Sequence, residues 1–155
     1  MFDCMTLFRE MDDFDEVKRT YNKIVESEIA YRGLDIGKED VLKDTIDACA
    51  CIIGRGSILS EDYKHYQKGL GGIKGHIYKT KYNGEYAAVY ACEVMYLAAS
   101  ILTDQDSCPY ITQPELYIDS KLALKGYQKL SYIKKAKIEA YGYIVEAVKM
   151  LELRK

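Results

Sequence analysis

The sequence predicts an all-α fold, a compact bundle of five or six helices around a central apolar helix at 84–102. Three observations lead to this prediction: apolar residues recur at helical spacing, most such segments are bounded by capping residues, and the run at 86–102 is rich in alanine, which favours helix over strand. With 155 residues, 48% of them hydrophobic and 30% charged, the chain has the size and composition of one globular domain. We therefore expect a single helical domain over 1–155.

Capping signals define the helices of the N-terminal half. A short lead-in, Phe2 to Met11, is predicted to form one or two helical turns. Asp12 or Asp13 can cap a long helix that runs to about Arg32 and ends at Gly33, which suits a left-handed C-cap. The apolar stripe of this helix is expected to pack into the core; it consists of Phe14, Val17, Tyr21, Ile24 and Val25.

Two further helices are predicted before the central one. The segment from Lys38 to Ile53 has its apolar residues on one side and is stopped by glycine. Ser60 is followed by two acids, a combination that suits the N-terminus of a short helix ending at Gly69.

The dipeptide Asn83-Gly84 leaves two structures open. It can form the turn of a small hairpin at 76–90, or Asn83 can cap the central helix, which we favour because of the alanine-rich run. This helix is apolar nearly all round, and its length and central carboxylate argue against a membrane span. That carboxylate, Glu93, must be buried with a partner, and we expect Lys137 or a tyrosine hydroxyl to provide it.

The C-terminal third is predicted to contain the last two helices. Thr112-Gln-Pro-Glu115 matches a capping box with proline in the first turn, which predicts a helix from Gln113 to about Lys125. A final helix runs from Lys129 to Leu153, and the two are separated or kinked at Gly126.

Charge falls in blocks, although the net charge is only −2. Residues 1–16 carry −5 and 85–120 carry −6, whereas 63–84 carry +5 and 121–155 carry +6. Neighbouring blocks can neutralise one another in the fold, or one block can face a charged partner. A second basic and aromatic patch could track a phosphate backbone, but without an overall excess of basic charge we rank nucleic acid low; it comprises Tyr127, Lys129, Tyr132, Lys134, Lys135 and Lys137.

The cysteines predict no disulfide framework and no zinc site, because they are odd in number and follow neither spacing; they are Cys4, Cys49, Cys51, Cys92 and Cys108. We interpret them as reduced thiols in a cytoplasmic protein, since the acidic N-terminus lacks the pattern of a secretion signal. We expect neither a metal nor a cofactor.

The stretch from Gly69 to Tyr82 combines glycine, lysine, histidine and tyrosine without any acidic side chain. It lacks the phosphate-loop and dinucleotide-binding patterns, so we interpret it as a flexible basic segment that could contact an anion or an acidic partner. The candidate ligand- or partner-binding residues are Lys64, His65, Lys68, Gly71, Gly72, Lys74, His76, Lys79 and Lys81.

Asp40, Asp44 and Asp47 share the polar face of the helix predicted at 38–53, where they could bind a divalent ion. This row of helical acids resembles that of the all-α nucleotide pyrophosphohydrolases, which implies a metal-dependent nucleotide hydrolase as one hypothesis. The sequence departs from that pattern, since the paired Glu-x-x-Glu is missing upstream and aspartate replaces the first glutamate. We favour a solvated helix face.

No serine or cysteine is placed with catalytic partners in the sequence, and fifteen tyrosines are unusually many for a chain of this length. The leading hypothesis is therefore a non-enzymatic intracellular interaction protein, a regulator, inhibitor or adaptor. It would bind a protein partner, or a second copy of itself, through tyrosine-rich and charge-segregated surfaces. The alternatives are a binder of a nucleotide or other phosphorylated small molecule through 64–81, the metal-dependent hydrolase, and an acid–base role for Glu93.

Overall fold

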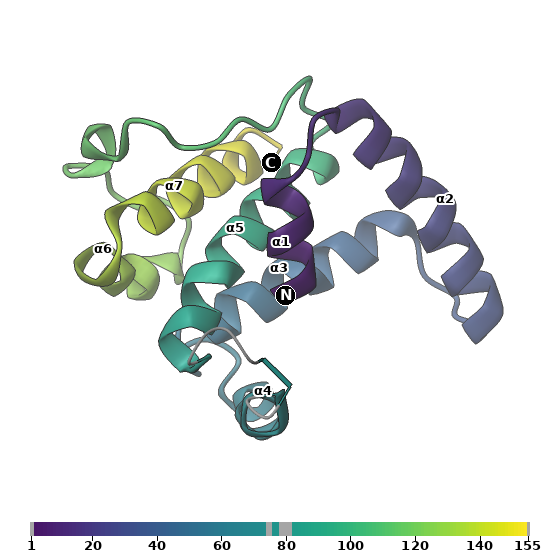
Figure 1. The fold of residues 1–155 in the computed structure, drawn as a ribbon, viewed down its shortest axis with the longest axis horizontal. Coiled ribbons are helices and arrows are strands. Elements are labelled where there is room, and N and C mark those ends of the chain that lie inside the picture. The colour runs from purple at the N-terminus through teal and green to yellow at the C-terminus, as the bar shows by residue number, and fades with distance from the viewer. Residues whose placement is uncertain (1, 74–75, 78–81, 155) are drawn as a thin grey trace.

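The computed structural model describes residues 2–73, 76–77 and 82–154, and every regular element in these ranges is a helix (Figure 1). The predicted all-α bundle is confirmed. No strand forms in the described ranges, and residues 78–81 of the alternative hairpin lie outside them. The helices are α1 (Phe2–Arg9), α2 (Phe14–Arg32), α3 (Lys38–Ile53), α4 (Ser60–Ile73), α5 (Gly84–Leu102), α6 (Ile133–Ala136) and α7 (Ile138–Leu153), with 3₁₀ turns η1 (Pro114–Tyr117) and η2 (Tyr127–Tyr132).

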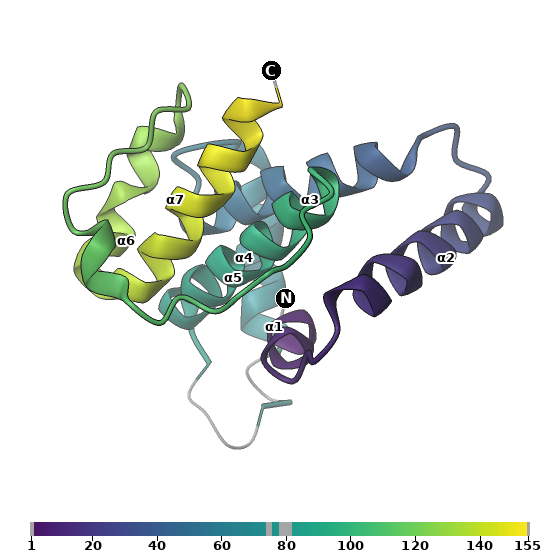
Figure 2. The same ribbon diagram turned by 90° about the horizontal axis from the view of Figure 1, so that it is seen from above.

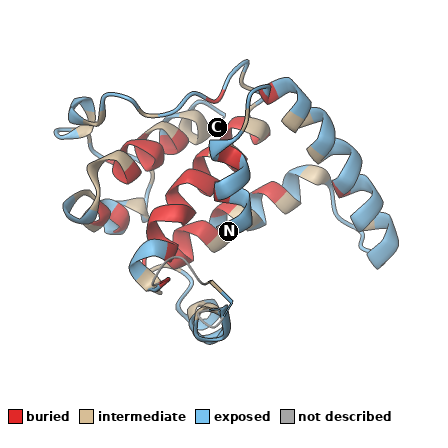
Figure 3. Ribbon diagram, viewed as in Figure 1, coloured by how far each residue is buried: buried red, intermediate tan, exposed pale blue. Residues whose placement is uncertain are grey.

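The other elements pack around α5, as predicted for the helix at 84–102. Buried residues are concentrated on α5, α7 and part of α3, whereas α2 and α4 are mostly exposed (Figure 3). The most extensive contacts of α5 are with α3 and α7, and α1 packs across it as well (Figures 1 and 2). By length and composition α5 could cross a membrane, but 72% of that window is buried inside the protein, as in the core helix of a globular domain.

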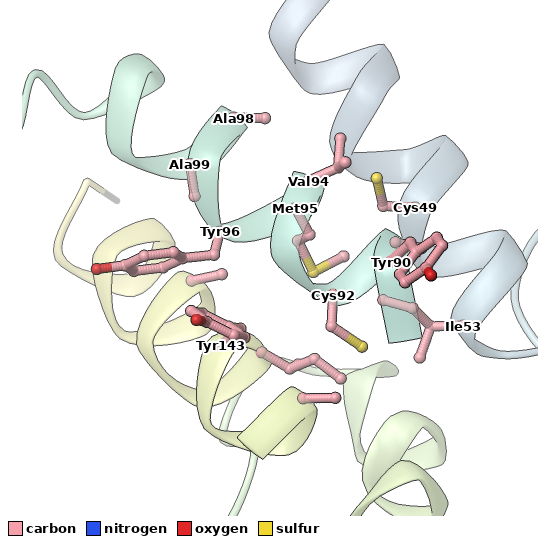
Figure 4. Close-up of a cluster of buried hydrophobic side chains, with 14 of the residues drawn as sticks. Cys49, Ile53, Tyr90, Cys92, Val94, Met95, Tyr96, Ala98, Ala99 and Tyr143 are labelled. Carbon is pink, nitrogen blue, oxygen red and sulfur yellow. The ribbon is translucent and has the colours of Figure 1, made fainter. Parts of the chain in front are cut away.

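Aromatic rings fill the core between α1, α5 and α7. The ring centroid of Phe8 lies 6.3 Å from that of Tyr96, 5.1 Å from Tyr110 and 6.0 Å from Tyr143, all in edge-to-face geometry. Figure 4 shows Tyr96 and Tyr143 facing each other between α5 and α7, with centroids 5.3 Å apart. Several of the tyrosines that suggested an interface therefore serve the core; the buried ones are Tyr82, Tyr90, Tyr96, Tyr141 and Tyr143.

The capped helices have the predicted boundaries. The Asp13 carboxylate accepts the N–H of Glu16 at the start of α2, and Gly33 ends that helix with φ +62°. The Asn83 side chain accepts the N–H groups of Glu85 at 2.9 Å and Tyr86 at 3.0 Å, which fixes the start of α5.

The glycines at the end of α4 do not stop it. This helix was predicted to end at Gly69, but it continues to Ile73. Glycine lowers helix propensity by only about 1 kcal/mol per residue, which is too little to break a helix by itself.

The C-terminal third differs most from the prediction. Gln113 makes no side-chain capping bond, and only the single 3₁₀ turn η1 forms where a helix to Lys125 was expected. The segment is held by packing on α7 instead, because Gly142 leaves room for the Tyr117 ring: a Cβ at 142 would lie 2.9 Å from Tyr117 Cδ2. The expected last helix is also divided, since Lys137 has extended backbone angles between α6 and α7.

Asn83→Ala should lower the free energy of unfolding by about 1 kcal/mol, because two amides at the start of α5 lose their acceptor. Asn83→Asp keeps an acceptor oxygen at the same place and should retain most of the stability. Urea denaturation of both variants measures the difference. Equal stability of the alanine and aspartate variants would contradict the assigned cap.

Candidate functional site

A groove of about 1050 Å³ lies between α1, α2 and α3, and residues of α5 also line it. Figures 1 and 2 show α2 at the outer edge of the molecule, away from α7. The apolar lining comes from all four helices and from the α2–α3 connection; it consists of Leu7, Phe8, Met11, Val17, Tyr21, Ile24, Val25, Ile29, Leu34, Ile36, Val41, Leu97 and Ile101.

The second helix contributes little to the core, which leaves its side of the groove open. Only Phe14 and Val25 of its apolar stripe are buried, while Val17 and Tyr21 are half-buried and Ile24 is 57% exposed. The prediction that the whole stripe packs into the core is therefore wrong. The reason is that α1 packs on α5, whereas the contacts of α2 are mainly with α3.

Polar contacts hold α2 in this outer position. The hydroxyl of Tyr21 donates to the carbonyl of Lys38 at 2.7 Å, and Lys38 pairs with Glu26 at 2.6 Å. Closer to the N-terminus of α2, Lys18 Nζ lies 3.1 Å from an Asp104 carboxylate oxygen and 3.0 Å from the carbonyl of Gln105. The helix is thus anchored beside α3 and beside the loop that follows α5.

The opposite wall, α1, is fixed by a charge pair. Glu93 is 2% exposed, and Arg9 donates from Nη2 to Oε1 at 2.6 Å and from Nε to Oε2 at 3.1 Å. The hydrogen bond to Glu93 raises the pKa of Arg9 above its ordinary value. Lys137, one of the two partners predicted for Glu93, pairs with Glu139 at 3.2 Å instead, and Arg9 was not among the predicted partners. Glu93 is thus a buried polar residue, as expected, with a structural partner from another helix.

The groove has an acidic rim. Its lining contains seven carboxylates and one arginine, Arg32, which pairs with Glu28 at 3.3 Å. Two further acids pair with bases, Asp13 with Arg19 and Asp40 with Lys43. The remaining four make no ion pair in the described part of the chain; they are Glu10, Asp12, Glu16 and Asp44. The rim therefore presents uncompensated negative charge to solvent beside apolar side chains.

The predicted basic segment lies away from this groove. Lys64, His65 and Lys68 are exposed on α4, where Lys64 lies 3.4 Å from Glu61. Gly71 and Gly72 belong to the last turn of α4, so they are helical and do not form a loop. His76 is exposed; Lys74, Lys79 and Lys81 lie outside the described residues. Anion or partner binding by this segment stays a prediction.

The aspartate row of α3 has separate local roles. Asp40 accepts the N–H of Gly37 at 2.9 Å, and this bond, with Lys43, lowers the pKa of its carboxyl. Partial burial, and then the nearby charge of Asp44, raises the pKa of Asp47. Among the described residues, no group of three potential metal ligands is close enough to hold an ion. Asp40 thus caps α3, and Asp40 and Asp44 contribute to the rim of the groove.

Buried thiols line the core. Cys92 donates to the carbonyl of Ala88 at 3.1 Å, and Cys108 lies 3.4 Å from the hydroxyl of Ser100. Burial raises the pKa of Cys92 well above its ordinary value and that of Cys108 to about 11. A high pKa suppresses the reactive thiolate, so these environments favour packing over nucleophilic chemistry.

The basic, aromatic patch near the C-terminus is largely engaged within the protein. Lys129 donates to the carbonyl of Ser57 at 3.2 Å, and the hydroxyl of Tyr132 donates to the carbonyl of Ile53. Lys134 lies 5.7 Å from the centre of the Tyr141 ring. These contacts link η2 and α6 to the rest of the bundle.

Sequence reasoning missed the groove residues because each looked ordinary alone. Leu34 and Ile36 are bulky apolar residues in a short helix connection, and Leu7 is 70% exposed on α1. The acidic block at residues 1–16 was visible, but only the fold brings it beside these side chains. Comparison with protein-family models, curated proteins and solved structures finds no match to this chain.

In the native protein at pH 8, a single thiol should react rapidly with an aromatic disulfide reagent. Cys4 is exposed, whereas burial protects the other four and raises the pKa of Cys51, Cys92 and Cys108. The remaining thiols should react only after unfolding in guanidinium. Cys4→Ser should remove the fast phase, and a second fast-reacting thiol would contradict the described core.

Proposed function

We propose that this chain is a non-enzymatic intracellular interaction protein, a regulator, inhibitor or adaptor, which binds a protein partner in the groove between α1, α2 and α3. The observation that carries the proposal is the exposure of four large apolar side chains along this groove: Leu7 is 70% exposed, Ile24 57%, Leu34 48% and Ile36 45%. Exposed apolar residues that gather in one concave surface are typical of binding sites.

The groove replaces the tyrosine-rich surface as the proposed contact. Tyr141 and Tyr143 are buried, and their hydroxyls bond to backbone groups: that of Tyr141 donates to the carbonyl of Ser120 at 2.8 Å, and that of Tyr143 accepts the N–H of Ile111 at 3.3 Å. The proposed contact surface is still charge-segregated, because the rim of the groove is acidic. Binding would cover the apolar lining that the monomer leaves in water.

A photo-crosslinking amino acid at Ile24 should capture one discrete partner in extract of the source cells, whereas the same group at Leu116 should not. Leu116 is 68% exposed on η1, outside the groove, and so is the matched control. Excess unlabelled protein should compete, but Leu7→Ser/Ile24→Ser protein should not. Equal labelling from both positions, or none from Ile24, would contradict the proposal.

A further inference from the structure

The groove has the length and the walls of a helix-binding site. α2 has 19 residues, which at 1.5 Å per residue gives a wall about 28 Å long. Apolar side chains from α1, α2 and α3 line the space along this wall. A helix of four to five turns would therefore find apolar contacts over its whole length.

The exposed apolar residues lie on two sides of this space. Leu7 projects from α1 and Ile24 from α2, while Leu34 and Ile36 belong to the connection between α2 and α3. An occupant with one apolar face would cover all of them together. An amphipathic helix offers such a face through residues at i, i+3 or i+4, and i+7.

The rim selects the charge of the occupant. Glu10, Asp12 and Glu16 lie where α1 leads into α2, and Asp44 lies on α3, so unpaired carboxylates flank the apolar lining from two directions. Complementary charge across an interface speeds association and disfavours partners of like charge. Basic residues on the polar edges of a bound helix would form ion pairs with these carboxylates.

The same charges disfavour the other occupants. Two copies of this groove packed face to face would bring the same carboxylates against each other, so an isologous dimer through this face is opposed. A membrane with anionic lipids would be repelled as well. An acidic helix would lose the rim contacts and gain repulsion.

We propose that the occupant of the groove is a basic amphipathic helix of a partner protein, about 18 residues long, with its apolar face on Leu7, Ile24 and Ile36 and its lysines or arginines on the acidic rim. This inference rests on the proposed function and adds the class of partner to it.

Three synthetic peptides of 18 residues test the inference. One places leucine and lysine at amphipathic helical spacing, the second replaces lysine by glutamate, and the third has the composition of the first in scrambled order. Fluorescence anisotropy in 0.15 M salt should give one-to-one binding of the leucine–lysine helix, on the order of a hundredfold tighter than the leucine–glutamate helix. The scrambled peptide should bind much more weakly than the first.

Two charge-reversal variants locate the site. Asp12→Lys/Asp44→Lys should lower the affinity for the leucine–lysine helix by about tenfold and raise the affinity for the leucine–glutamate helix. Glu115→Lys/Asp119→Lys makes the same change in net charge at exposed positions outside the groove and should alter neither affinity by more than about twofold. Leu7→Ser/Ile24→Ser should lower the affinity for the leucine–lysine helix, although the net charge of the protein stays the same.

Distinct results separate this inference from the proposed function. If the leucine–glutamate helix binds as tightly as the leucine–lysine helix and Leu7→Ser/Ile24→Ser weakens both, the basic partner is wrong although the groove still binds a helix. A protein that sediments as a dimer and binds no peptide would also overturn the basic partner. If none of the peptides binds and crosslinking from Ile24 is no greater than from Leu116, both proposals are wrong.

Discussion

The bundle depends on how one buried carboxylate is compensated. Glu93 lies in the middle of the central helix with 2% of its surface exposed, and no base of α5 itself can reach it because the helix has none. A buried charge without a partner is costly, so another element must bring a cation. Arg9 does so with two hydrogen bonds from α1, and its own side chain stays 44% exposed. The N-terminal helix is thereby tied to the centre of the fold.

This pairing also fixes α1, which forms one wall of the groove. α1 packs on α5, whereas α2 stays at the edge of the molecule, where Lys18 and Tyr21 hold it. The apolar residues left between the two helices form the groove. A single electrostatic requirement in the core therefore has a consequence at the surface, where the proposed partner would bind.

Local signals predicted much of the fold and little of the candidate site. Asp13, Gly33 and Asn83 act through their neighbours in sequence, so the boundaries of α2 and α5 follow from local chemistry. The capping box before Glu115 failed because contact with α7 outweighs a local preference. Arg9 stands 84 residues from its partner, and nothing in the spacing distinguishes it from Lys137. The groove depends on where α2 settles, which hydrophobic periodicity does not specify.

The coupling free energy between Arg9 and Glu93 tests this account most directly. Urea unfolding of Arg9→Met, Glu93→Gln and the double variant forms a double-mutant cycle. Arg9→Met should be the more destabilising single change, because it leaves the carboxylate buried and unpaired, whereas the partly exposed guanidinium can turn to water. The account predicts a coupling of at least about 1.5 kcal/mol. Single changes that add to within about 0.5 kcal/mol would contradict it.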